Sequence, residues 1–216
     1  MLNSEFRERE TITNLILYYL FKEIIITPIF YTYFRGKIYG IENVPRKNPL
    51  IIVSNHASYF DPPILGGGVG RPVAFMAKQE LFDIPFLRKG IQLYGAYPVK
   101  RSLGDRGAIR AALNALKEGW IAGIFLEGTR TIDGRIHKPK LGAAMIAAKA
   151  QLPLLPVCLW GTHEILPKGA RIPISVPVTL RIGTIIDPPT STKRPELEAV
   201  TQKCAIAINE MHDLGR

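Results

Sequence analysis

Short apolar runs alternate along the chain with segments whose apolar residues recur at helical spacing. The apolar runs predict strands over residues 49–54, 73–77, 95–99, 121–126, 154–159 and 176–182, and a strand followed by a turn over 37–44. Helices are predicted over 105–118, 141–150 and 195–214. In the first of these, Ile109, Leu113 and Leu116 share one helix face. This alternation predicts an α/β class domain, with a mostly parallel central sheet flanked by helices.

The N-terminal segment 11–34 is far more apolar than the rest of the chain. Its length would suffice to cross a bilayer, which takes ~20 apolar residues. However, Lys22 and Glu23 stand at its middle, and each charge at a helix centre costs roughly 2.5–3.5 kcal/mol. Pro28 also interrupts the helical pattern. We therefore predict one helix over 11–26, a break, and a short helical piece to Phe34, lying in one leaflet rather than spanning it.

Aromatic and basic residues support a membrane-docking segment over residues 1–36, followed by the main domain over 37–216. Four tyrosines suit an interfacial position, and two cations follow them for lipid phosphates: Tyr18, Tyr19, Tyr31 and Tyr33, then Arg35 and Lys37. The alternative is an apolar helix that packs against the protein core.

Composition and charge narrow the choice of partners without deciding it. The 216 residues suit one domain with a small appendage, and 28 Lys and Arg against 18 Asp and Glu give a net charge of +10. This excess suits an anionic membrane, phosphorylated substrates or nucleic acid. Because the cations are scattered, without a basic stripe interleaved with aromatic residues, we expect no nucleic acid partner. A basic membrane- or nucleic-acid-binding module without catalysis is the alternative from another class.

The two cysteines are far apart and lack CxxC spacing, so zinc and a disulfide framework are not expected. A reducing compartment is the plain interpretation. Cys158 lies in an apolar run and is predicted to be a buried small hydrophobe. We expect no metal and no bound cofactor.

The sequence V-S-N-H-A-S-Y-F-D-P-P over residues 53–63 holds a histidine and an aspartate directly after a predicted strand. Five residues turn a helix by about 500°, which leaves His56 and Asp61 on different helix faces. The two side chains meet only if the chain bends after the strand and becomes helical later. A buried carboxylate would then fix the imidazole tautomer and leave the other ring nitrogen as a base. On this spacing alone, a polar turn whose groups cap one another is the better interpretation.

No protein nucleophile accompanies this pair. The sequence has no G-x-S-x-G elbow, and neither cysteine has a polar, activating context. The base would therefore have to activate a hydroxyl group carried by the substrate.

Two further polar blocks follow predicted strands. The first is G-A-Y-P-V-K-R, residues 95–101, and the second is E-G-T-R, residues 127–130. In open α/β sheets ligands bind at the carboxyl ends of strands, and an arginine there can grip a phosphate with its planar fork. Solvated cations, and a turn with an internal Glu–Arg pair, are the alternatives for the two blocks.

Together and in this order, the three blocks resemble those of the glycerophospholipid acyltransferase family, in its lysophosphatidate acyltransferase branch. The resemblance covers residues 39–161. The N-H-x-S-x-x-D motif falls on Asn55, His56, Ser58 and Asp61, and A-K-x-E-L falls on 77–81. The G-x-x-x-x-x-R motif falls on Gly95 and Arg101, and E-G-T-R falls on Glu127, Gly128, Thr129 and Arg130. Tyr97 and Pro139 depart from the commoner family residues.

The resemblance implies acyl transfer from an acyl thioester, carried by acyl carrier protein or coenzyme A, to the sn-2 hydroxyl of 1-acyl-glycerol-3-phosphate. It implies His56 as the base, Asp61 as its orienting carboxylate, and Lys78, Arg101 and Arg130 as ligands of the acceptor's phosphate. Asn55, Ser58, Gly95, Glu127, Gly128 and Thr129 would support the pocket. Glycerol-3-phosphate or another lysophospholipid is the alternative acceptor. We expect the protein at the cytoplasmic face of a membrane, as a peripheral or a monotopic protein.

Overall fold

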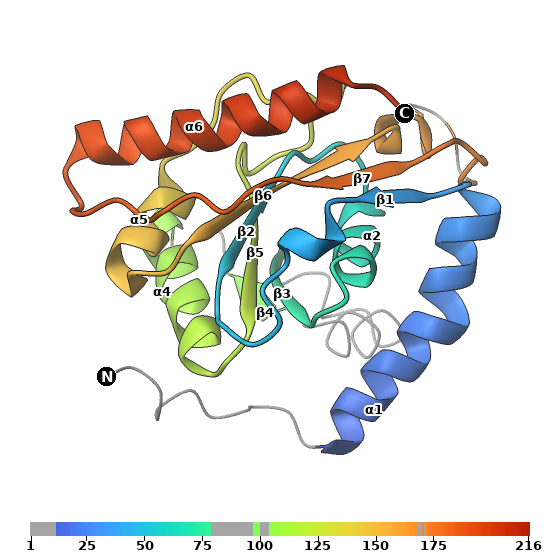
Figure 1. Cartoon of the computed structure of the whole chain (residues 1–216), viewed down its shortest axis with the longest axis horizontal. Helices are drawn as coiled ribbons and strands as arrows, with labels where there is room; N and C mark the ends of the chain where they lie inside the picture. The colour runs from blue at the N-terminus through green and yellow to red at the C-terminus, as the bar shows by residue number, and fades with distance from the viewer. Residues whose placement is uncertain (1–11, 79–96, 100–103, 168–169, 171) are drawn as a thin grey trace.

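The computed structural model describes residues 12–78, 97–99, 104–167, 170 and 172–216. Within these residues the chain folds around a seven-stranded sheet in the order β1-β7-β6-β2-β5-β3-β4 (Figure 1). The strands are β1 Lys37–Tyr39, β2 Ile51–Ser54, β3 Val73–Lys78, β4 Tyr97–Val99, β5 Ile121–Phe125, β6 Leu154–Trp160 and β7 Thr179–Ile182. All neighbouring pairs are parallel except β6 and β7, so the predicted α/β class with a mostly parallel sheet is confirmed.

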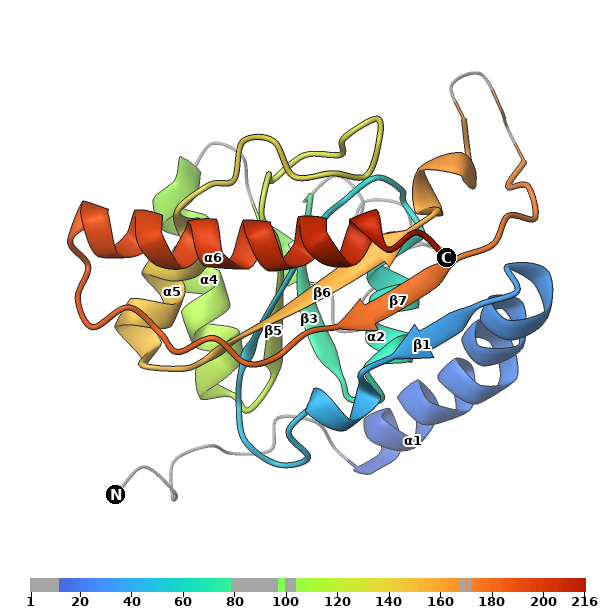
Figure 2. The ribbon, with the colours of Figure 1, turned by 45° about the horizontal axis from the view of Figure 1, so that its top comes forward.

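Helices cover both faces of the sheet (Figure 2). They are α1 Ile12–Phe21, α2 Asp61–Gly68, α4 Gly104–Lys117, α5 Gly142–Ala150 and α6 Arg194–Asp213, with the short helical pieces η1 Lys22–Ile26, η2 Ile29–Tyr33, η3 Ile41–Asn43 and η6 Thr162–Glu164. A hydrophobic core lies on each face of the sheet, and alternate residues of β2 point into one or the other. Ile52 packs with α2 on one face, while Ile51 and Val53 pack with α4, α5 and α6 on the other. Helices on both faces explain why β2 is buried at every position.

Helix α2 is the element that the hydrophobic pattern did not predict. Its sequence, D-P-P-I-L-G-G-G, carries two prolines and three glycines and therefore has poor helix propensity. Pro62 and Pro63 fall in the first turn, where a missing N–H costs nothing. Gly68 lies so close to β7 that an added Cβ would come within 2.8 Å of Leu180. Tertiary packing therefore selects this helix in spite of its composition.

The predicted break in the N-terminal helix is wrong. The backbone stays helical from α1 through η1 and η2, and Pro28 itself adopts φ −62° and ψ −45°. The pieces on either side of Pro28 are π-helical, with Thr27 N–H bonded to Lys22 O and Phe34 N–H bonded to Ile29 O at 3.0 Å. The backbone thus passes a residue that cannot donate a helical hydrogen bond by way of wider turns on either side of it.

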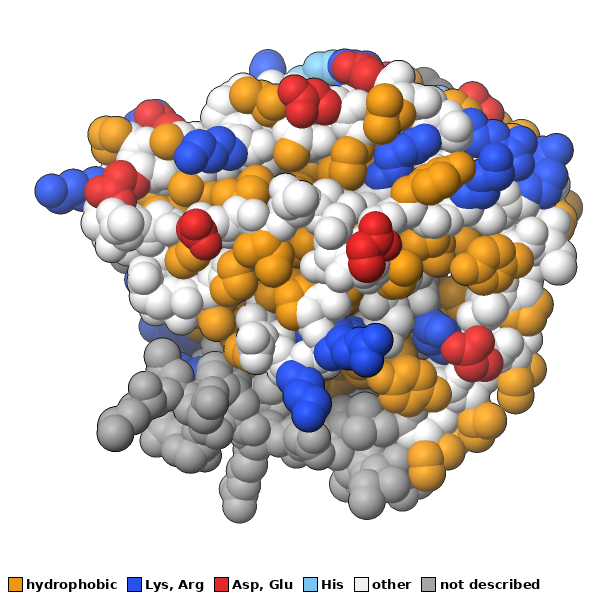
Figure 3. Space-filling view, in the orientation of Figure 1, with side chains coloured by type: hydrophobic (Ala, Val, Ile, Leu, Met, Phe, Trp, Pro, Cys, Tyr) orange, Lys and Arg blue, Asp and Glu red, His pale blue; other side chains and the backbone are white. Residues whose placement is uncertain are grey.

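One side of this N-terminal helical segment packs on the domain and the other is exposed. Phe30 and Phe34 belong to the core between the sheet and α2, in line with the core-packing alternative. Tyr18 is also buried and donates to Gly66 O at 3.3 Å, so its predicted interfacial position is wrong. Large apolar residues are exposed on this segment: Ile16, Leu17, Tyr19, Leu20, Ile24, Ile25, Ile29, Tyr31 and Tyr33. In Figure 3, apolar side chains are visible along the right-hand edge, where Figure 1 places α1.

Among the described residues, no helix combines the length and the apolar character needed to cross a membrane. The division into residues 1–36 and 37–216 stays a prediction. Both cysteines are free and buried, which confirms the prediction for Cys158.

Candidate active site

The site lies where two adjacent parallel strands end. Ser54, the last residue of β2, is in register with Phe125, the last residue of β5. The chain after β2 carries the histidine motif, and the chain after β5 carries E-G-T-R. Both polar blocks therefore leave the sheet at the same edge, where open α/β sheets place their ligands.

His56 and Asp61 meet although they do not share a helix. The chain bends over residues 55–58, and Asp61 is the first residue of α2. Its Oδ2 lies 2.7 Å from His56 Nδ1 and accepts the backbone N–H groups of Ala57 and Ser58, each also at 2.7 Å. The turn that brings the two side chains together thus uses the carboxylate as its own capping group, so the polar-turn and the paired-residue interpretations are both correct.

This arrangement defines the histidine tautomer. Asp61 is fully buried, while the side chain of His56 is 19% exposed. Because Nδ1 donates its proton to Asp61 Oδ2, Nε2 carries the lone pair. The amides of Ala57 and Ser58 are committed to Asp61, so they are not available as donors to a developing oxyanion.

The imidazole of His56 rests on an aromatic stack. The rings of His56 and Phe125 are nearly parallel, with centroids 4.0 Å apart, and Phe75 stacks behind Phe125 at 5.6 Å. Gly123 provides the space for this stack, since a Cβ there would lie 2.4 Å from the Phe75 ring. Packing therefore fixes the plane of the imidazole, and the contact with Asp61 fixes its rotation.

Asn55 joins the histidine turn to two other segments. Its amide nitrogen donates to Gly134 O at 2.6 Å and to Leu159 O at 2.7 Å, and its oxygen accepts Leu159 N–H at 2.8 Å. Ser58 acts within the turn, where its hydroxyl oxygen accepts Phe60 N–H at 3.3 Å. Both residues are buried and hold the backbone of the site in place.

The E-G-T-R block forms a tight turn at the end of β5. Gly128 has φ +66° and donates to Phe125 O at 3.0 Å, a conformation that favours glycine. A Cβ on Gly128 would lie 3.2 Å from the ammonium of Lys140, which places a further cation against this turn. Thr129 and Arg130 are exposed on the same turn.

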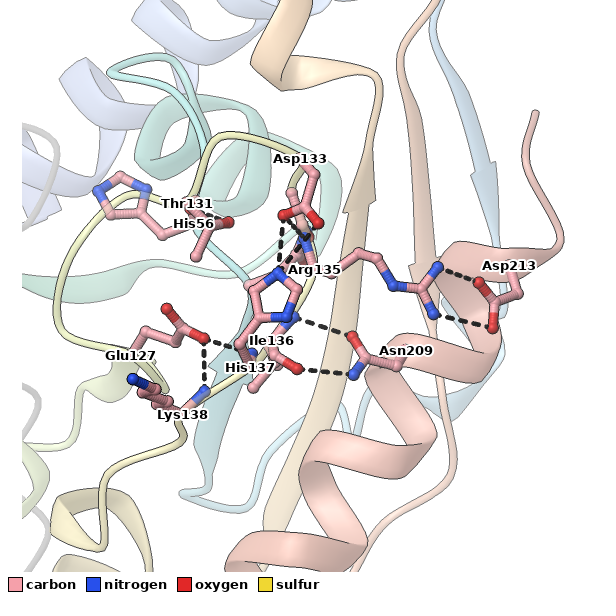
Figure 4. Close-up of polar contacts among 12 residues, drawn as sticks. His56, Glu127, Thr131, Asp133, Arg135, Ile136, His137, Lys138, Asn209 and Asp213 are labelled. Carbon is pink, nitrogen blue, oxygen red and sulfur yellow. Dashed lines mark hydrogen bonds and ion pairs between the residues drawn. The ribbon is translucent and has the colours of Figure 1, made fainter.

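Glu127 faces its own loop. Its Oε1 accepts the backbone N–H groups of His137 and Lys138, the latter at 2.8 Å (Figure 4). Within the described part of the chain, no ion pair joins Glu127 to Arg130, which contacts Tyr59 instead. Glu127 thus braces the loop that carries Arg130.

The same loop is tied to the histidine turn and to the C-terminal helix. Thr131 N–H donates to His56 O at 2.8 Å. On α6, Asn209 exchanges two hydrogen bonds with Ile136, at 2.9 and 2.8 Å, and Asp213 pairs with Arg135 (Figure 4). The base and the E-G-T-R turn are therefore held at a fixed separation by elements far apart in sequence.

The remaining predicted residues lie at the same edge or outside the described residues. Lys78 ends β3 in register with Val99 of β4, at the carboxyl edge of the sheet, and its side chain is not described. Gly95 and Arg101 lie outside the described residues.

Sequence reasoning missed three residues of the site: Phe125, Tyr59 and Asn209. The sequence pattern predicts an ordinary strand residue at Phe125 and a solvated helix position at Asn209. Tyr59 was detectable, because it is an aromatic residue inside a polar turn.

Cys158, Cys204 and His212 are buried, and burial shifts the pKa of each. Desolvation raises the pKa of Cys158 and of Cys204 to about 12, so neither thiol is a nucleophile near neutral pH. His212 is buried on α6, and this burial lowers its pKa, with Arg135 and His163 adding to the effect. In the described residues, no group of His, Cys, Asp or Glu side chains is arranged to hold a metal ion.

Known proteins share this fold and these blocks. Residues 35–160 match the family model described as Acyltransferase. A 1-acyl-sn-glycerol-3-phosphate acyltransferase from Bacillus subtilis is 34% identical over 137 residues, which are 62% of this chain and 68% of that protein. A chloroplastic enzyme of the same description from Brassica napus is 34% identical over 144 residues, 65% of this chain and 42% of that protein.

A solved structure is similar over most of the chain. It is the crystal structure of the 1-acyl-sn-glycerophosphate acyltransferase PlsC from Thermotoga maritima, with a TM-score of 0.77 and 30% identity over 92% of this chain and 80% of that one. The match to the family model covers more than half of the sequence, so the chain belongs to the Acyltransferase family. It spans about two fifths of the length of the plant relatives and about two thirds of the Bacillus one.

Proposed function

We propose that this protein transfers a fatty acyl group from an acyl thioester to the sn-2 hydroxyl of 1-acyl-glycerol-3-phosphate, giving phosphatidic acid. The observation that carries the proposal is the contact of 2.7 Å between His56 Nδ1 and Asp61 Oδ2. No cysteine of the chain is placed to act as a nucleophile, and a base of this kind can take the proton of a hydroxyl group that the substrate carries. The relatives from Bacillus subtilis and Brassica napus carry the corresponding description.

The reaction follows from the tautomer of His56. Nε2 accepts the proton of the acceptor hydroxyl as its oxygen attacks the thioester carbonyl. The tetrahedral intermediate collapses with cleavage of the carbon–sulfur bond, and the imidazolium returns the proton to the leaving thiolate. The buried carboxylate of Asp61 stabilises the imidazolium during this cycle. Neither a metal nor a bound cofactor takes part in these steps, because acyl carrier protein or coenzyme A delivers the acyl group as a cosubstrate.

Cations near the base would bind the acceptor's phosphate. Arg130 lies on the turn that Thr131 ties to the His56 carbonyl, so its charge is kept near the base. Lys78 ends β3 at the same edge of the sheet, and the resemblance to the family adds Arg101 as a third phosphate ligand. Arginine suits a phosphate because its planar fork donates two parallel hydrogen bonds.

The exposed apolar side of the N-terminal helical segment would dock the protein on the cytoplasmic leaflet that holds its acceptor. Exposed isoleucine, leucine and tyrosine side chains are expected to enter the interfacial region, and the net charge of +10 favours an anionic surface.

The test is a panel of acceptors and donors with the purified full chain in mixed micelles. We expect lysophosphatidate to be preferred over glycerol-3-phosphate and over lysophospholipids with larger head groups. His56→Ala should reduce turnover by roughly 10²–10⁴-fold. His137→Ala is the matched control, because His137 also pairs with a carboxylate, that of Asp133, but is exposed. Preference for glycerol-3-phosphate would overturn the acceptor assignment, and unchanged turnover in His56→Ala would overturn the mechanism.

A further inference from the structure

Tyr59 and Arg130 form a two-point contact at the edge of the site. The guanidinium carbon of Arg130 lies 3.6 Å from the centroid of the Tyr59 ring, and Nη2 donates to the Tyr59 hydroxyl at 2.9 Å. The stack fixes the plane of the guanidinium, and the hydrogen bond fixes its rotation within that plane. Both side chains are exposed, and Tyr59 is 64% exposed. The ring therefore contributes little to the core, and its described polar contact is with Arg130.

The position of Tyr59 links this contact to the base. Tyr59 stands between His56 and Asp61, directly after the two amides that Asp61 accepts. Arg130 is bound to this turn through Tyr59, and the next residue, Thr131, is bound to it through the His56 carbonyl. Arg130, by its side chain, and Thr131, by its backbone, are thus both hydrogen-bonded to the turn that carries His56.

A free arginine on a surface loop samples many rotamers and loses that freedom when it binds a ligand. A guanidinium already held on a ring loses less, so its affinity for an anion is higher. Nη2 uses one N–H group for the tyrosine hydroxyl, and no hydrogen bond within the described part of the chain occupies the other four N–H groups of the guanidinium, which suit an anionic ligand. We propose that Tyr59 is a positioning residue, which holds the fork of Arg130 ready for the phosphomonoester of the acceptor.

This inference rests on the proposed function for the identity of the acceptor. The inference goes beyond the proposed function by assigning a role to Tyr59. It also distinguishes the contribution of the Tyr59 ring from that of the Tyr59 hydroxyl. The phosphate is bound alike in the ground state and in the transition state. Loss of Tyr59 should therefore raise KM more than it lowers kcat.

Kinetics with lysophosphatidate supply the first test. Tyr59→Leu removes the ring and the hydroxyl, and KM should rise about 10-fold with kcat changed less than about 3-fold. Tyr59→Phe keeps the ring, and KM should rise only about 2–3-fold. Tyr39→Leu is the matched control, because Tyr39 is also exposed and lies under an arginine, Arg181, at 5.1 Å. Its KM should equal that of the unmodified protein.

Binding of sn-glycerol 3-phosphate, a soluble phosphomonoester, supplies the second test without requiring turnover. Calorimetric titration should show weaker binding in Tyr59→Leu and in Arg130→Ala than in the unmodified protein. The double variant should bind as weakly as Arg130→Ala and no more weakly. Melting curves check that each variant folds. Equal binding by Tyr59→Leu and the unmodified protein, or additive losses in the double variant, would overturn the inference. Inactivity of the unmodified protein on lysophosphatidate would instead overturn the proposed function, with the titration still deciding the role of Tyr59.

Discussion

The imidazole of His56 lies flat against the ring of Phe125, with the centroids 4.0 Å apart and the planes 14° from parallel. This contact fixes the plane of the imidazole ring, which the hydrogen bond to Asp61 does not fix by itself. Such ring pairs contribute ~0.5–1.5 kcal/mol beyond the area that they bury. We expect Phe125→Leu to reduce kcat about 3–10-fold, on the scale that this energy allows. Steady-state kinetics measure the loss.

Phe75→Leu is the comparison for this change, because Phe75 supports Phe125 from behind and does not stack on the imidazole. It should lower the melting temperature and leave more of kcat than Phe125→Leu does. An equal kcat in Phe125→Leu and the unmodified protein would show that the stack does not orient the base.

Asp61→Asn should abolish most of the activity while the backbone of the turn is retained. Oδ2 accepts three hydrogen bonds, and Oδ1 is buried without a partner among the described residues. An amide would either point its NH₂ at three donors or bury an unpaired donor, and in both orientations the charge that stabilises the imidazolium is lost. We expect kcat to fall by ~10²–10⁴-fold.

Asp133→Asn provides the matched control for Asp61→Asn, since Asp133 also pairs with a histidine, His137, but in an exposed position. Its kcat should be unchanged. Retained kcat in Asp61→Asn would remove the carboxylate from the mechanism.

Membrane attachment should depend on the exposed side of the N-terminal helical segment. Leu20 and Ile24 are 49% and 67% exposed there, and a charge at these positions opposes entry into the interfacial region. The double variant Leu20→Glu/Ile24→Glu should sediment less with anionic liposomes. Ile206→Glu, on α6 and 47% exposed, should sediment like the unmodified protein. Equal sedimentation of all three proteins would contradict the docking surface.

His212 should make the fold sensitive to mild acid. Burial, Arg135 and His163 lower its pKa, and the nearby Asp213 and Asp133 only partly oppose this. Since the folded pKa lies below the unfolded value of about 6.5, the unfolded chain binds more protons between the two values. His212 therefore contributes stability above about pH 6.5, and this contribution is lost as the pH falls through that value toward the folded pKa.

Melting temperatures of His212→Gln, measured from pH 7.5 to 5.5, should fall less steeply with acid than those of the unmodified protein. Parallel curves for His212→Gln and the unmodified protein would show that His212 is not the sensitive group.

The sequence predicted most of the sheet because four of its described strands, β2, β5, β6 and β7, are buried on both faces. Continuous apolar runs such as residues 49–54 are then unmistakable, and β2 lies inside that range. The pattern failed where packing overrides propensity. The glycine-rich α2 forms against the sheet, and the helix passes Pro28 because the register widens on either side.

For the site, the sequence determined the chemistry of the residues and the order in which strands deliver them. The sequence supplies a histidine, a carboxylate and an arginine, and the alternating pattern places them after predicted strands. Only the tertiary structure decided that His56 and Asp61 meet, since that depends on the bend between β2 and α2. It also decided that Phe125 backs the base and that Tyr59 holds Arg130, because these pairs come from different strands or loops and no local spacing encodes their contact.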